Sequence, residues 1–147
     1  MSTPLVDVIR LGPATKIRLT TLKRRTGIEN WNVLCRWAFC LSVSDAEPIS
    51  ERNSDNGSAI EMTWKTFAGD HEEIYEILLR SRLAVDAVVA SNTGFAGVIR
   101  SHVIRGVSRL TAIRGTESVQ DLLQVALERP FARDPFPASL QEKISDG

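Results

Sequence analysis

The feature that most constrains this chain is the apolar segment at residues 30–43, NWNVLCRWAFCLSV, in which Arg36 carries the only charge. A helix that is apolar on nearly every side must be covered on several sides. A chain of 147 residues can form one compact domain with a core but divides poorly into two. We therefore expect the chain's later helices, together with another subunit, to cover this segment.

Charge is segregated along the chain, although the formal net charge is +0. Residues 1–40 contain seven basic residues and two carboxylates, whereas residues 41–86 contain ten carboxylates and four basic residues. Residues 87–115 contain four arginines and no carboxylate. A neutral protein can thus still present a basic face.

The remaining pattern predicts a mainly α protein, a compact helical domain with one short N-terminal strand. The β-branched segment 5–10 reads as the strand, and Pro13 and Gly27 bracket a helix over 13–26. The other expected elements are an exposed loop at 50–58, a helix from Asp70 to 91–94, a helix over 95–114 and a short helix over 116–127.

Two apolar stripes support the later helices. The residues of the first are at helical spacing, typical of the buried face of an amphipathic helix: Ile74, Ile77, Leu78, Val85 and Val88. The second stripe lies on one face of the following helix and contains Phe95, Ile99, Val103, Leu110 and Ile113.

The helix over 13–26 carries the candidate binding residues. Leu19 and Leu22 are expected to point inward, which leaves the basic side chains on the two flanks. Residues seven apart share a side and lie about 10 Å apart along the axis, a spacing that can straddle phosphates. The candidate DNA-binding residues are Lys16 and Lys23 on one flank, Arg18 and Arg25 on the other, and Arg24 beyond Lys23. The alternative is a solvated helix face with no ligand.

The order of a strand, a helix ending in Thr-Gly and an apolar helix is that of ribbon-helix-helix DNA-binding proteins, whose strands pair across a dimer. Base-reading members present polar side chains from the strand, whereas LVDVIR offers only Asp7 and Arg10. We therefore expect contacts to phosphates, which confer affinity but no sequence preference.

Three longer segments are more distinctive. LKRRTGIENWNVLCRWAFCLS at 22–42, EMTWKTFAGDHEEIYEILLRSR at 61–82 and SHVIRGVSRL at 101–110 resemble the DndE family of the bacterial DNA phosphorothioation system. The resemblance covers most of residues 5–127. We therefore expect a DndE-like helical domain over 1–127 and a Pro-containing C-terminal tail over 128–147.

The resemblance implies a ribbon-helix-helix-like core, a homo-oligomer, and binding of double-stranded DNA, nicked DNA in particular, through surface lysines. It also implies three partners: a cysteine desulfurase, a sulfur-transferring adenylating enzyme and an ATPase. The leading hypothesis is a non-catalytic DNA-binding component of this system. An adaptor whose acidic middle segment docks a basic partner is the alternative, and a DNA-nicking enzyme is less favoured.

The residues that could carry other chemistry favour structural roles. Cys35 and Cys40 are expected to be free thiols packed inside a helix, not persulfide carriers. Arg36 is expected to be buried and held by a carboxylate or by carbonyls. His102 shares a flank with Arg105 and Arg109, for which we favour a solvated edge over a second phosphate contact.

No catalytic residue, cofactor or metal site is predicted. His71 and His102 lack a second His or Cys at ligand spacing, and SNTGFAG lacks the Lys-Ser/Thr pair of a Walker motif. No apolar run approaches the length that spans a bilayer, and the N-terminus lacks the order of a signal peptide. We therefore expect a cytoplasmic protein that does not contact membranes.

Overall fold

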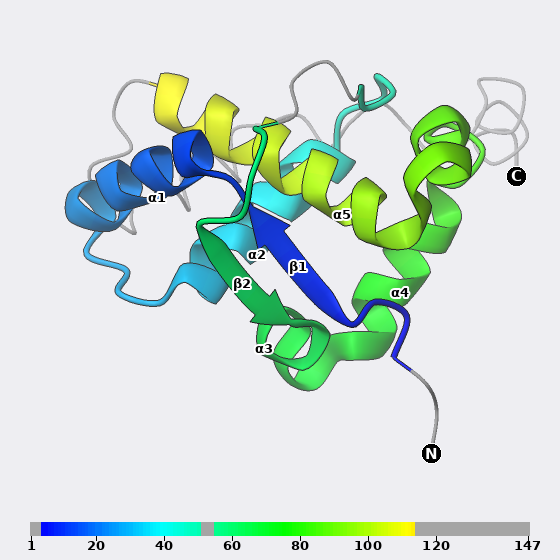
Figure 1. Ribbon diagram of the computed structural model, residues 1–147, viewed down its shortest axis with the longest axis horizontal. Coiled ribbons are helices and arrows are strands. Elements are labelled where there is room, and N and C mark those ends of the chain that lie inside the picture. The colour runs from blue at the N-terminus through cyan, green and yellow to red at the C-terminus, as the bar shows by residue number, and fades with distance from the viewer. Residues whose placement is uncertain (1–3, 51–54, 114–147) are drawn as a thin grey trace, which may run out of the picture.

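Helix α2 runs through the middle of the fold (Figure 1). The structure is a computed structural model, and it describes residues 4–50 and 55–113. Its elements in chain order are β1 (Val8–Leu11), α1 (Pro13–Thr26), α2 (Trp31–Val43), β2 (Ile60–Thr63), α3 (Trp64–Ala68), the 3-10 helix η2 (Gly69–His71), α4 (Glu72–Ser81) and α5 (Ala87–Ala112). The predicted fold class, mainly helical with one short N-terminal strand, is confirmed.

The close packing of α5 on α2 forms the centre of the core. Leu34, Cys35, Ala38 and Phe39 of α2 are fully buried. Gly106 makes the approach possible, because a Cβ at this position would lie 1.9 Å from the Ala38 carbonyl oxygen. The chain's own helices therefore cover much of the apolar segment 30–43.

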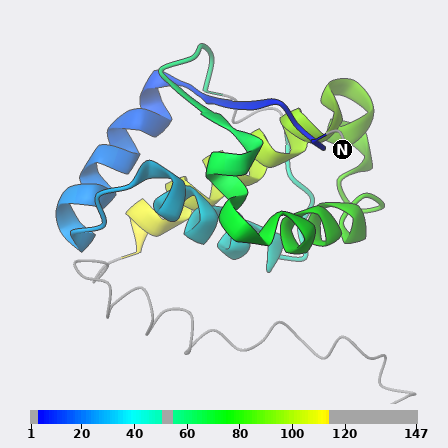
Figure 2. The ribbon, with the colours of Figure 1, turned by 90° about the horizontal axis from the view of Figure 1, so that it is seen from below.

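The N-terminal strand finds its partner within the same chain. β1 pairs antiparallel with β2, with Val8 opposite Thr63 and Leu11 opposite Ile60. Strand β2 was not predicted, because four residues are too few to show a clear alternation of apolar and polar side chains. This pairing differs from that of ribbon-helix-helix proteins, whose strands pair across a dimer. Figure 2 shows the two strands in a layer above α2 and α5, with α1 and α4 at opposite ends.

The helix predicted from Asp70 to 91–94 is divided into several elements. A turn at residues 82–86 separates α4 from α5, and Leu79 is the buried residue of α4. The apolar stripe predicted for this helix is largely on the surface: exposed residues are Ile74, Ile77, Val85 and Val88. Leu79 and Tyr75 of α4 pack in and against the core instead, so the side of the helix that carries Ile74 and Ile77 faces outward.

The second half of the fold agrees better with the sequence pattern. Gly94 has φ 70° and ψ −169° and interrupts α5 near the predicted helix end at 91–94. The stripe that begins at Phe95 continues into the core, where Ile99, Val103 and Leu110 are buried. The helix expected at 116–127 and the tail at 128–147 lie outside the described residues. No helix in the described part is long and apolar enough to cross a membrane.

Candidate nucleic-acid interface

Helix α1 begins and ends where its sequence predicts. Pro13 occupies the first turn, where its missing N–H costs nothing. Gly27 ends the helix in the left-handed conformation, with φ 75°, and its N–H donates to the Lys23 carbonyl at 3.0 Å. Lys23, Arg24 and Arg25 fill the last turn, where cations interact favourably with the helix dipole.

Helix α1 is held to the rest of the fold from its buried face and from its N-terminus. Leu19 and Leu22 are fully buried, as predicted. The Thr15 N–H donates to the Asp55 carboxylate at 2.6 Å. Desolvation alone would raise the pKa of Asp55, but the backbone donors of Thr15 and Ala14 and the nearby Arg100 outweigh it and lower the pKa. The carboxylate thus fixes the helix N-terminus.

The basic side chains of α1 lie on both flanks and on the outer face of the helix. The Lys23 ammonium lies 5.0 Å from the centroid of the Trp31 ring at the start of α2. Arg25 lies on the side of α5, where its Nη1 donates to the Thr111 carbonyl at 3.3 Å. Lys16 and Arg24 are exposed and Arg18 is half-buried.

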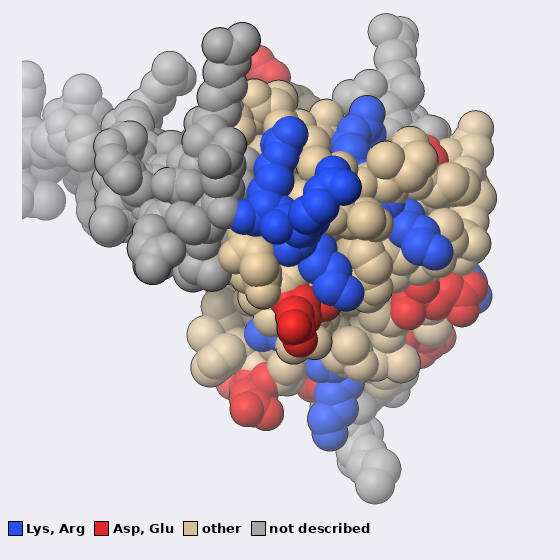
Figure 3. Space-filling model, turned by 90° about the vertical axis from the view of Figure 1, so that its left-hand side faces the viewer, with Lys and Arg blue, Asp and Glu red and all other residues tan. Residues whose placement is uncertain are grey.

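These five side chains are not neutralised by the described part of the chain. Within residues 4–50 and 55–113, none of them forms an ion pair with a carboxylate. Figure 3 faces the end of the molecule where α1 lies and shows Lys and Arg side chains crowded together, with carboxylates directly below them and at the right. The structure therefore brings the predicted residues together on one accessible basic surface.

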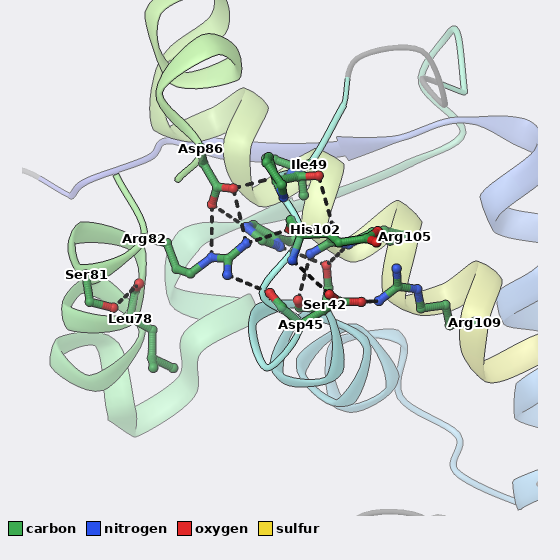
Figure 4. Close-up of polar contacts among 12 residues, drawn as sticks. Ser42, Asp45, Ile49, Leu78, Ser81, Arg82, Asp86, His102, Arg105 and Arg109 are labelled. Carbon is green, nitrogen blue, oxygen red and sulfur yellow. Dashed lines mark hydrogen bonds and ion pairs between the residues drawn. The ribbon is translucent and has the colours of Figure 1, made fainter. Parts of the chain in front are cut away.

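His102 is not on a solvated edge, which corrects the sequence-based expectation. Its side chain is fully buried, with Nδ1 2.8 Å from Ser42 Oγ and Nε2 2.7 Å from Asp86 Oδ2 (Figure 4). Arg105 donates to Ser42 Oγ at 2.7 Å. Arg82 reaches Asp86 Oδ1 at 3.3 Å. This polar cluster could not be predicted from local sequence patterns, because its residues come from α2, the 82–86 turn and α5.

The protonation states in this cluster follow from its burial. Burial lowers the pKa of His102 to about 4, against the opposing effect of Asp86. Burial opposes ionisation of Asp86 as well, but hydrogen bonds from His102 and Arg82 outweigh it and lower the pKa of the carboxyl. A neutral imidazole donates from Nε2 to Asp86 and accepts at Nδ1 from the Ser42 hydroxyl.

The Ser-His-Asp contacts do not form a hydrolytic site. Ser42, Asp86 and His102 are all buried, and the Ser42 hydroxyl oxygen already accepts from Arg105. A nucleophile must be reachable by its substrate. The cluster instead joins the end of α2, the 82–86 turn and α5. Within the described residues, no group of three or more His, Cys, Asp or Glu could hold a metal ion.

The arginines of α5 are used to hold neighbouring segments. Arg100 donates to the carbonyls of Arg10 and Asp55, and Arg105 donates to the Glu47 carbonyl at 2.9 Å. Arg109 pairs with Asp45. These contacts disfavour the second phosphate surface considered for this helix, whereas Arg114 lies outside the described residues.

The two cysteines differ in their surroundings. Cys35 is buried, and desolvation raises the pKa of its thiol to about 12 despite the nearby Arg36. Cys40 is exposed, which corrects the expectation that both thiols are packed inside, and partial desolvation raises its pKa in spite of a hydrogen bond with Tyr75. Arg36 is half-buried, and its Nε donates to the Asn32 carbonyl at 3.3 Å, one of the two expected kinds of partner.

The fold and the basic surface define a small helical protein with a short strand pair and one cationic helix. The family model described as DNA sulphur modification protein DndE matches residues 8–118. The chain therefore belongs to the DndE family, which takes part in DNA phosphorothioation.

Solved structures agree with this assignment at the level of the fold. The crystal structure of DndE from Escherichia coli B7A, involved in DNA phosphorothioation modification, is 23% identical, with a TM-score of 0.56, and the match covers 72% of this chain and 98% of that chain. A DndE variant with two glycine-to-lysine substitutions, involved in DNA phosphorothioation, is 20% identical, with a TM-score of 0.53 and coverage of 71% and 95%. A comparison with curated proteins gave no match.

Proposed function

We propose that this protein is a non-catalytic DNA-binding component of the phosphorothioation system and that it holds double-stranded DNA, preferably nicked, by its phosphates. The observation that carries the proposal is the basic surface of α1, whose five cations have no carboxylate partner among the described residues. Phosphates are the natural counterions of such a surface. The contacting residues are Lys16, Arg18, Lys23, Arg24 and Arg25.

The cations of α1 differ in how firmly they are held, and each flank carries one that contacts a neighbouring element. Lys23 and Arg25 are positioned by the Trp31 ring and the Thr111 carbonyl, so little side-chain freedom remains to be lost on binding. Lys16 and Arg24 extend from the exposed face and can follow the phosphate backbone. A nick favours such binding because the duplex bends more easily there and can follow a convex helix.

The proposal includes assembly and partners. Half-buried Trp31 and Trp37 keep part of α2 at the surface, which favours a homo-oligomer. Light scattering at micromolar concentration tests this point, and a monomeric mass contradicts it. The cysteine desulfurase, the adenylating enzyme and the ATPase of the same system are the proposed protein partners, which exchange oxygen for sulfur on the DNA held here.

A gel-shift experiment tests the proposed function. Intact duplex, nicked duplex and single-stranded DNA of one sequence are compared at two salt concentrations. We expect nicked duplex to bind most tightly and all affinities to fall with salt. Equal, salt-insensitive binding of the three DNAs contradicts the proposal. Incubation with supercoiled plasmid and a divalent metal serves as a test for nicking, which a non-catalytic component does not perform.

A further inference from the structure

The corner formed by α4, the 82–86 turn and the start of α5 presents an unusual concentration of apolar side chains. The large apolar side chains exposed among the described residues are Ile17 and four residues of this corner: Ile74, Ile77, Val85 and Val88. Single exposed apolar residues need no explanation, but several on one short stretch mark an interaction site. Ile74 and Ile77, at 54% and 65% exposed, share one face of α4 at i, i+3 spacing.

Folding does not account for these positions, because α4 is already held by its opposite face. Leu79 is buried at 1% exposure, and the Tyr75 ring packs 5.3 Å from the Phe67 ring and 5.7 Å from the Phe39 ring. The end of the helix is fixed by the Arg82–Asp86 pair. The exposed isoleucines therefore stand on a rigid support that needs no rearrangement to bind a partner.

The charges around the isoleucines indicate the chemistry of that partner. Residues 70–81 contain four carboxylates, those of Asp70, Glu72, Glu73 and Glu76, and a single basic side chain, Arg80. Arg80 is already paired with Glu76 at 3.1 Å. A second copy of α4 would bring the Glu73 carboxylates of both chains close together, which like-charge repulsion disfavours.

We propose that the α4 surface, defined by Ile74, Ile77 and Glu73, docks a protein partner that presents an apolar helix face bordered by lysine or arginine. The apolar side chains provide the contact area, and the acidic rim selects a basic partner and speeds its association. The site lies at the opposite end of the molecule from α1 (Figure 1), so it is separate from the proposed DNA surface.

The test uses two labelled helical peptides of about 18 residues. Both carry a leucine stripe, flanked in one by lysine and in the other by glutamate, and fluorescence anisotropy reports their binding to the full chain. We expect saturable binding of the lysine peptide alone. The Ile74→Ser, Ile77→Ser double variant should weaken this binding by about tenfold or more, and Ile17→Ser, a matched loss of an exposed isoleucine on the basic helix, should leave it unchanged.

The controls separate this proposal from the others. Both isoleucines are exposed, so the double variant should keep its thermal stability and its affinity for nicked DNA. Unchanged peptide binding by the double variant overturns the proposal. Sedimentation without peptide compares the oligomeric mass of the double variant with that of the unsubstituted protein. A smaller mass of the variant also overturns the proposal, because the surface would then bind a second copy. DNA binding by the α1 variants tests the proposed function separately. These variants should bind the lysine peptide as well as the unsubstituted protein does.

Discussion

The Nε2 atom of His102 lies 2.7 Å from the Oδ2 atom of Asp86, and both side chains are buried. The first belongs to α5 and the second ends the turn that follows α4. Ser42 at the end of α2 completes the contact from the other side of the ring. This buried contact joins the end of α2, the 82–86 turn and α5.

Stability should fall as the pH decreases from 6.5 to 4. Burial lowers the pKa of His102 from 6.5 to about 4, so between these values the unfolded chain binds a proton that the folded chain does not. The corresponding loss is about 3 kcal/mol. Urea denaturation at a series of pH values measures it. His102→Gln should flatten the profile in this window, and an identical slope in the variant contradicts the assignment.

Asp86→Asn should destabilise the protein by about 3 kcal/mol. The substitution leaves the buried Arg82 without its carboxylate. It also replaces one of the two acceptor oxygens with an NH2 group, which must then face a donor of His102 or Arg82. The matched control is Glu76→Gln, which breaks the exposed Glu76–Arg80 pair and should cost about 0.5 kcal/mol or less. Chemical denaturation measures both, and equal effects of the two substitutions contradict the importance of burial.

The Lys16→Ala, Lys23→Ala, Arg24→Ala triple variant should lose most of its affinity for nicked duplex DNA. The slope of log affinity against log salt is negative, and each lost phosphate contact should lower its magnitude by about 0.9. The control removes three exposed cations elsewhere through Arg10→Ala, Lys65→Ala and Arg80→Ala. Gel shifts over a salt series measure both slopes. An unchanged slope in the α1 variant, or an equal loss in the control, shows that α1 is not the contact surface.

Gly106→Ala should destabilise the protein far more than Gly27→Ala. A Cβ at Gly106 meets the backbone oxygen of Ala38 at 1.9 Å, so α2 and α5 must move apart, at a cost of about 3 kcal/mol or more. At Gly27 no atom lies within 4 Å of the added Cβ, and only the φ of 75° is unfavourable, by about 1 kcal/mol. Thermal denaturation ranks the two, and the reverse order contradicts the close helix contact.

One of the two cysteines should react with Ellman's reagent in the native protein. Cys40 is exposed but its pKa is raised, so its reaction at pH 8 should be slow. Cys35 is buried with a pKa of about 12 and should react only after denaturation. Counting released thiolate against time measures this. Rapid reaction of the Cys40→Ser variant in its native state contradicts the assignment of Cys35 as a packing residue.

The sequence alone determined the features that depend on residues close together in the chain. The Pro13 and Gly27 signals bracket α1 at its observed ends, because helix initiation and termination are local. The inward direction of Leu19 and Leu22 follows from helix geometry, which also places the basic residues on the flanks and outer face. Helical periodicity likewise predicts the mainly helical class, and the distinctive local segments indicate the family.

The tertiary structure decided which surfaces are covered. Helical spacing shows that Ile74 and Ile77 share a face, but only packing shows that Tyr75 and Leu79 take the place against the core. A helical-wheel projection likewise cannot show that His102 contacts Asp86, sixteen positions away. Pairing of β1 with β2 joins residues about fifty positions apart. Burial and long-range pairing depend on the whole arrangement of elements, whereas helix periodicity records only near neighbours.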